Sequence, residues 1–132
     1  MSKTLWQTIK LGLSTVTVIL VLVSSALAAE VLVTQTRLLS QTEVSQQMQG
    51  LPGWTTDGTK LSRTYQFKNF VEAIGFVNRL VEPAETANHH PDIAISYNKI
   101  TISLTTHDAG GLTQQDFNLA QIISQLSLGS DK

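Results

Sequence analysis

The chain of 132 residues contains no cysteine, which excludes disulfide bonds, thiolate nucleophiles and cysteine-ligated zinc. Charge is also scarce, at 14% of residues, and residues 1–28 carry only Lys3 and Lys10. The remaining 104 residues hold 7 basic and 10 acidic side chains, a net charge of −3. A nucleic-acid site needs a basic patch that neutralises phosphates, so we expect no nucleic-acid partner. The length fits one domain with a modest core.

The N-terminal segment has the three-part layout of a secretory signal peptide. Two lysines precede an uncharged stretch, and Ala26-Leu27-Ala28 is a small-x-small site of the kind that signal peptidase cuts. Residues 11–28 are also just long enough to span a bilayer, so an uncleaved membrane anchor is the alternative. We therefore assign residues 1–29 to a signal peptide or anchor. Either one places the domain outside the cytoplasm, in a periplasmic, lumenal or secreted location.

The folded domain is expected over residues 40–132, after a linker at residues 30–39. Ser40 and Glu43 have the spacing of a capping box, which predicts a helix over residues 41–49.

Apolar periodicity predicts the rest of the domain. A helical face runs over residues 70–84, where Pro83 should kink or end the helix, and a second capping box at Thr113 and Asp116 begins the last helix. The expected strands are a short one at Trp54, then residues 61–67, 93–97 and 100–107, with Asn98-Lys99 as the last turn. Tight turns make these strands antiparallel, and single apolar helix faces must cover one side of the sheet. The sequence thus predicts an α+β two-layer domain, a four-stranded antiparallel sheet with three helices on one face.

All three histidines fall within a short stretch of the domain. His89-His90-Pro91 follows the long helix, Glu85 precedes His89 by four residues, and His107 closes the last strand. The intervening hairpin brings His107 back beside the pair, which predicts three imidazoles and a carboxylate at one end of the sheet. Spacing alone leaves three interpretations open: polar loop residues, a general acid–base site, or zinc held by three histidines. Adjacent histidines on extended backbone tend to diverge, which weakens the zinc interpretation.

The spacing of these residues resembles a known signature. Its members here are Glu85, His89-His90-Pro91, Tyr97, His107 and Asp116. This pattern is similar to that of the pterin-4a-carbinolamine dehydratases, also called 4a-hydroxytetrahydrobiopterin dehydratases. Leu51-Pro52-Gly53-Trp54 and the run TTHDAGGLT at residues 105–113 extend the resemblance over residues 40–128.

The resemblance implies the fold predicted above, assembly into dimers or tetramers, and a small-molecule pterin substrate. It implies loss of water from a 4a-hydroxytetrahydropterin to give quinonoid dihydropterin, with no metal or organic cofactor. By resemblance, His89 and His107 are general acids toward the 4a-hydroxyl on either pterin face. His90 binds the ring and assists proton transfer.

The resemblance also assigns neighbouring residues. Glu85, Asn88 and Pro91 are assigned to substrate binding, although Glu85 also fits a plain helix-end carboxylate or a group that orients an imidazole. Many family members have aspartate at the position of Asn88, and some have tryptophan at the position of Ile93. Tyr97 is expected to be a packing residue of its strand. Asp116 has a structural alternative, as the third residue of a capping box.

A second function class remains open, an exported dehydratase-like scaffold or assembly factor that binds protein without catalysis. Retention of all three histidines favours the enzyme. The structural discriminator is whether the three imidazoles converge on an open cleft. Divergent imidazoles or a filled cleft would favour the scaffold.

Overall fold

A four-stranded antiparallel sheet forms one layer of the fold in the computed structural model, which describes residues 36–128. The strands are β1 (Thr55–Thr56), β2 (Leu61–Gln66), β3 (Asp92–Ser96) and β4 (Lys99–Leu104). Their spatial order is β1-β2-β4-β3, so β2 and β4 are central and β3 is an edge strand. In β4, Ile100, Ile102 and Leu104 are buried and alternate with less buried residues, as one covered sheet face requires.

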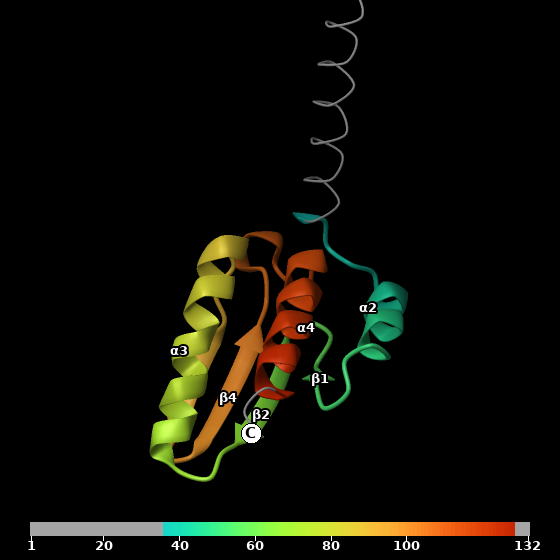
Figure 1. Cartoon of the computed structure of the whole chain (residues 1–132). Helices are drawn as coiled ribbons and strands as arrows, with labels where there is room; N and C mark the ends of the chain where they lie inside the picture. The colour runs from blue at the N-terminus through green and yellow to red at the C-terminus, as the bar shows by residue number, and fades with distance from the viewer. Residues whose placement is uncertain (1–35, 129–132) are drawn as a thin grey trace, which may run out of the picture. The chain divides into compact units, whose positions relative to one another are not determined.

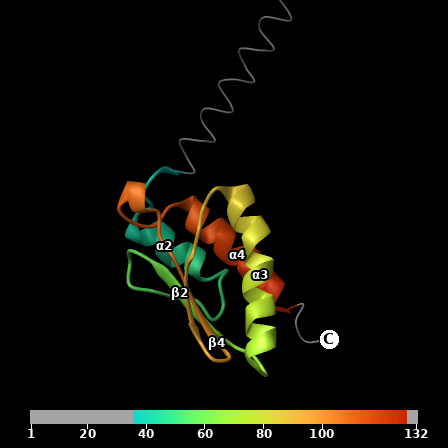
Figure 2. The ribbon, with the colours of Figure 1, turned by 90° about the vertical axis from the view of Figure 1, so that its left-hand side faces the viewer.

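Helices form the second layer. They are α2 (Gln41–Met48), α3 (Phe70–Ala87) and α4 (Gln114–Leu128), with a short 3₁₀ helix η1 (His107–Ala109) after β4. Figure 1 shows α3 and α4 side by side across the sheet, with α2 on the far side of α4, and the turned view in Figure 2 agrees. The predicted α+β fold, with its four-stranded antiparallel sheet and three helices, is confirmed.

The core lies between these layers. Its largest fully buried apolar side chains come from the sheet, from α3 and α4, and from the loops before β1 and α4. They are Leu51, Leu61, Phe76, Ile100, Ile102, Leu104, Leu112, Phe117, Leu119 and Ile123. Burying each such side chain is worth about 1.5–3 kcal/mol. The core therefore holds α3, which precedes His89, and Leu112, which follows His107, so both ends of the segment that carries the histidines are anchored.

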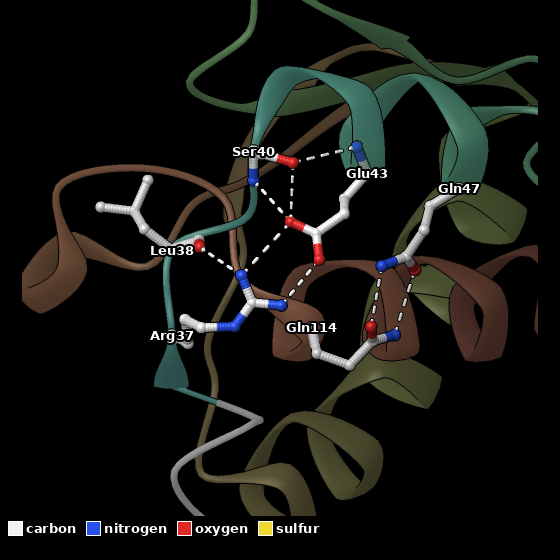
Figure 3. A network of polar contacts seen from close by, with 6 residues as sticks. All are labelled: Arg37, Leu38, Ser40, Glu43, Gln47 and Gln114. Atoms are coloured by element: carbon white, nitrogen blue, oxygen red, sulfur yellow. Dashed lines mark hydrogen bonds and ion pairs between the residues drawn. The ribbon is translucent and has the colours of Figure 1, made fainter.

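The entry into α2 is held by a polar network (Figure 3). Glu43 closes the predicted capping box, accepting from the backbone N of Ser40 at 2.8 Å, and it also accepts from Arg37 Nη2 at 2.7 Å. Further along, the amides of Gln47 and Gln114 exchange two hydrogen bonds, at 2.7 and 3.1 Å, which tie α2 to α4. Leu39, expected in a linker, donates its backbone N–H to Leu112 at 2.8 Å and packs on the core. The folded unit therefore begins before residue 40.

The structure differs from local expectations at three points. Pro83 does not end its helix: α3 continues to Ala87, because the other helix bonds and the buried face formed by α3 outweigh the one missing donor. The hairpin turn is Tyr97-Asn98 and not Asn98-Lys99. Strand β4 ends at Leu104, so residues 105–107 are not part of it.

The predicted signal peptide or anchor at residues 1–29 lies outside the described residues. Among residues 36–128, no helix combines the length and apolarity needed to cross a membrane.

Candidate functional site

The end of α3 directs His89 into the protein. Asn88 adopts a left-handed conformation (φ 46°, ψ 40°), which asparagine tolerates better than most residues. The backbone N of Asn88 donates to Glu85 O and that of His89 to Ala84 O, both at 3.1 Å, the pattern of a Schellman motif. Asn88 thus has a defined backbone role, and the turn it makes leaves His89 only 8% exposed.

His89 contacts a buried carboxylate. Its Nε2 lies 2.7 Å from Oδ1 of Asp116, which is fully buried in the first turn of α4. The other carboxylate oxygen, Oδ2, accepts from the backbone N of Thr113 at 2.8 Å and from Oγ1 of Thr106 at 2.9 Å. Both oxygens of this buried carboxylate are therefore hydrogen-bonded, as a buried charge requires.

These contacts assign the ring protons. An ionised carboxylate only accepts hydrogen bonds, so His89 Nε2 must carry a hydrogen that it donates to Asp116. The neutral ring then has Nδ1 as its acceptor, and the protonated ring donates from Nδ1. Asp116 also accepts from the backbone N of Thr113, which is the predicted capping bond. The carboxylate therefore serves the helix and the histidine together.

His90 points to a different carboxylate. Its Nε2 lies 2.9 Å from Oε1 of Glu85, and both side chains are more than half exposed. His90 also borders a hollow of about 170 Å³ between α3 and the start of β3. The lining residues are Val77, Leu80, Val81, Ala84, Glu85, His90, Pro91 and Ile93. This hollow offers a mostly apolar wall with one imidazole and one carboxylate at its edge.

His107 was expected to close a strand, and this expectation was wrong. It opens η1, where its side chain is exposed. The 3₁₀ turn forms because the carbonyl of Thr106 accepts from the backbone N of Ala109 and Gly110, both at 3.1 Å. The following Gly110 takes a left-handed conformation (φ 73°), which ends η1.

The site residues come together at one end of the sheet, but not as one tight cluster. Asp92, at the start of β3, pairs with Ser103 near the end of β4, so the segment with His89 and His90 and the segment with His107 leave the sheet at the same end. The two adjacent histidines bind carboxylates on different helices. The hollow is lined by His90 and by neither other histidine. The three imidazoles therefore do not converge on this hollow, and His89 is buried, which counts toward the scaffold alternative.

Other predicted site residues have clear places. Pro91 lines the hollow, together with Ile93. Tyr97 was expected to pack in its strand, and this was wrong. It lies in the hairpin turn with φ 53° and 68% of its surface exposed, because the chain reverses there before the side chain can reach the core.

Metal ligation is not favoured by this geometry. Within residues 36–128, no group of three or more His, Asp or Glu side chains is arranged to hold a metal ion. The separation of His89 and His90 onto different carboxylates accounts for this in physical terms.

Two members of the site were missed from the sequence. Thr106 and Thr113 contribute hydroxyls that lie 2.8 Å apart beside the Asp116 carboxylate. Both fall within the run TTHDAGGLT, which carried part of the resemblance. The sequence signal for these two residues was their position next to the histidines of the signature. The fold shows which carboxylate their hydroxyls contact.

Comparison with known proteins gives consistent matches. The family model described as "Pterin 4 alpha carbinolamine dehydratase" matches residues 37–126. A protein of Cyanothece sp. (strain PCC 7425 / ATCC 29141) is 64% identical over 91 residues, covering 69% of this chain and 94% of that protein. One of Nostoc sp. (strain PCC 7120 / SAG 25.82 / UTEX 2576) is 62% identical over 91 residues, covering 69% and 98%. Both bear the name "Putative pterin-4-alpha-carbinolamine dehydratase".

A solved structure is similar as well. The crystal structure of a "transcriptional coactivator/pterin dehydratase" from Brucella melitensis superimposes with a TM-score of 0.64 at 31% sequence identity. The match covers 67% of this chain and 96% of that one.

Proposed function

The chain belongs to the pterin 4 alpha carbinolamine dehydratase family, and on that premise we propose that it removes water from a 4a-hydroxytetrahydropterin to give quinonoid dihydropterin. The observation that carries the proposal is the buried pair of His89 and Asp116, whose atoms lie 2.7 Å apart at the end of the sheet where His90 and His107 also lie. A carboxylate held against one ring nitrogen is the arrangement that fixes an imidazole for proton transfer through the other.

The reaction needs two proton transfers. The C4a–O bond breaks as a proton reaches the departing hydroxyl, and the proton on N5 passes to a base, a role we give to neutral His90, as the C4a–N5 double bond forms. Water and the dihydropterin are the products. Positioned acid–base groups contribute about 10²–10⁴-fold to such steps. In this proposal the protonated ring of His89 donates from Nδ1, because Nε2 is bonded to Asp116. His107 is the second acid, for a hydroxyl on the opposite pterin face.

The hollow beside His90 supports a binding role for that residue, whereas neither proposed acid, His89 or His107, lines it. A planar pterin has apolar faces and a polar rim, and the hollow combines an apolar wall with His90 and Glu85 at its edge. We assign ring binding and assistance to proton transfer to His90. Glu85 orients the His90 imidazole, and Pro91 and Ile93 form the wall.

A dehydration assay tests the proposal directly. The purified protein is mixed with freshly generated 4a-hydroxytetrahydropterin, and the appearance of quinonoid dihydropterin is followed by ultraviolet absorbance. We expect a rate well above the spontaneous one. No acceleration by a folded protein would reject the enzyme and favour the dehydratase-like scaffold that binds another protein.

We also propose that the chain assembles with itself through edge strand β3. All five residues of β3 are exposed, including Ile93 at 36% and Ile95 at 46%. An antiparallel pairing of two copies centred on Ala94 sets each Ile93 opposite an Ile95, and sets Asp92 opposite Ser96, so no like charges meet. An exposed apolar edge is otherwise an aggregation hazard.

Sedimentation velocity tests this assembly. The substitution Ile95→Lys should shift the protein toward monomer, whereas Gln49→Lys, at the exposed end of α2, should not. A monomeric unsubstituted protein at micromolar concentration would reject the pairing.

A further inference from the structure

Thr106 occupies a position between two of the proposed catalytic histidines. It immediately precedes His107, and its hydroxyl lies 2.9 Å from Oδ2 of Asp116, the carboxylate that holds His89. His89 and His107 lie on different segments. Thr106 nevertheless contacts the carboxylate that holds His89 and directly precedes His107 in the chain.

The backbone of Thr106 anchors the turn that carries His107. Its N–H donates to Gly111 O at 3.0 Å, and its carbonyl accepts from the backbone N of Ala109, Gly110 and Gly111. Thr106 and Gly111 also form an isolated antiparallel bridge. Backbone hydrogen bonds to Thr106 therefore close the turn that contains His107.

The side chain of Thr106 orders the carboxylate. Its single hydroxyl hydrogen goes to Asp116, because an ionised carboxylate only accepts. The hydroxyl of Thr113 lies 2.8 Å from Thr106 Oγ1, to which it donates, with a longer contact of 3.4 Å to Oδ2 of Asp116, and it accepts from the backbone N of Gln115 at 3.3 Å. Both hydroxyls thus lie on the Oδ2 side of the carboxylate, which leaves Oδ1 for His89.

We infer that Thr106 is a positioning residue that fixes the His89 ring through Asp116 and sets the place of His107 relative to it. The catalytic part of this role rests on the proposed function, whereas the effect on the His89 ring does not. Removing the hydroxyl takes the 2.9 Å donor from Oδ2 and leaves the backbone N of Thr113 at 2.8 Å and the Thr113 hydroxyl at 3.4 Å. The carboxylate is then less firmly oriented, and the hydrogen bond from His89 Nε2 to Oδ1 is less well aligned.

Paired substitutions separate the hydroxyl from the shape of the side chain. Thr106→Val removes the hydroxyl and keeps the shape, whereas Thr106→Ser keeps the hydroxyl. Thr64→Val is the matched control. The hydroxyls of Thr64 and Thr101 lie 2.9 Å apart in the middle of the sheet, and neither residue belongs to the core. Amide spectra establish that each variant is folded.

The first measurement is the hydrogen bond from His89 Nε2 to Asp116, read from the ¹⁵N and ¹H chemical shifts of the Nε2–H group in the full chain. We expect Nε2–H in all four proteins, because the carboxylate still faces Nε2, and changed Nε2–H shifts in Thr106→Val but not in Thr106→Ser or Thr64→Val. This readout needs no activity, so it tests the inference even where the dehydratase assay fails. Unchanged Nε2–H shifts in Thr106→Val would overturn the inference.

The second measurement is turnover of 4a-hydroxytetrahydropterin. Thr106→Val should lower kcat about tenfold or more, the range for losing a hydrogen bond to a charged group, with a smaller change in KM. Thr106→Ser should stay within about twofold of the unsubstituted protein. If Thr106→Ser loses as much activity as Thr106→Val, the methyl group and not the hydroxyl matters, and the inference is rejected.

Discussion

His89 and Asp116 lie 27 residues apart in the chain, yet Nε2 of the histidine and Oδ1 of the aspartate are 2.7 Å apart with both residues buried. The bond joins the end of α3 to the start of α4, the two long helices that cover the sheet. Packing of these helices therefore determines the geometry of the ring that we propose as an acid.

Replacing this carboxylate should separate catalysis from capping. In Asp116→Asn the side-chain oxygen still serves the backbone N of Thr113, but the amide N–H₂ faces the N–H of the His89 ring and favours the other tautomer. We expect kcat to fall by about 10²–10⁴-fold and the free energy of unfolding by about 1–3 kcal/mol. Dehydration assays and urea denaturation measure the two effects. Asp92→Asn, on the exposed edge strand, is the control, and equal kcat in both variants would contradict the assignment.

The three histidines should differ in their effects. Substitution of His90 by alanine should slow turnover of both stereoisomers of the 4a-hydroxyl, because it removes a contact used in both orientations. Loss of His89 or His107 alone should chiefly affect one stereoisomer, and loss of both should be far worse than either. Steady-state rates on resolved stereoisomers measure this. A double variant no worse than the poorer single one indicates a single relay and not two alternative acids.

The stability of the His89 variant needs its own control. Truncating His89 leaves the Asp116 carboxylate buried without one of its partners, which costs about 1–3 kcal/mol. His107 is exposed, so its truncation should cost less than about 0.5 kcal/mol. Thermal denaturation shows whether each variant is still folded at the assay temperature.

Glu85 should act on binding and not on stability. Its contact with His90 is exposed on both sides, and such pairs are worth about 0–1 kcal/mol. We expect Glu85→Gln to raise KM about two- to fivefold with little change in unfolding, because the imidazole is less well oriented at the hollow. Glu82→Gln, another exposed glutamate of α3, is the matched control. The same change in KM for both would show a general charge effect.

The network at the start of α2 predicts part of the acid dependence of stability. Hydrogen bonds from Arg37 and then Ser40 lower the pKa of Glu43 from 4.5 to about 2. Its ionised form therefore stabilises the fold above pH 4.5, and this contribution is lost as the pH falls toward 2. The stability deficit of Glu43→Gln, measured by urea denaturation, should be constant above pH 5 and shrink below it. A deficit independent of pH over this range would show that charge is not involved.

The N-terminal prediction is tested on the native protein. We propose that the chain is exported and cleaved after Ala28 or Ala29, on the evidence of the small-residue site after the uncharged stretch. N-terminal sequencing should then begin at or next to Glu30. Recovery of Met1 in a membrane fraction would support the anchor over residues 11–28.

The sequence by itself determined the α+β fold, the element order and most of the candidate site. Periodicity of 2 and 3.6 residues is a local property, and it places core residues such as Ile102 and Phe76 without reference to the rest of the chain. Capping is also local: the box at Ser40 is complete, and the predicted bond from the backbone N of Thr113 to Asp116 is present.

Only the tertiary structure decided which groups meet. Pro83 stays inside α3, His107 leaves the strand for a 3₁₀ turn, and Tyr97 is turned out to solvent. Each outcome depends on where the chain must reverse to bury the core, and side-chain spacing does not encode that. The pairing of His89 with Asp116, and of Asp116 with Thr106, arises because α3 and α4 pack side by side and bring distant residues within hydrogen-bonding distance.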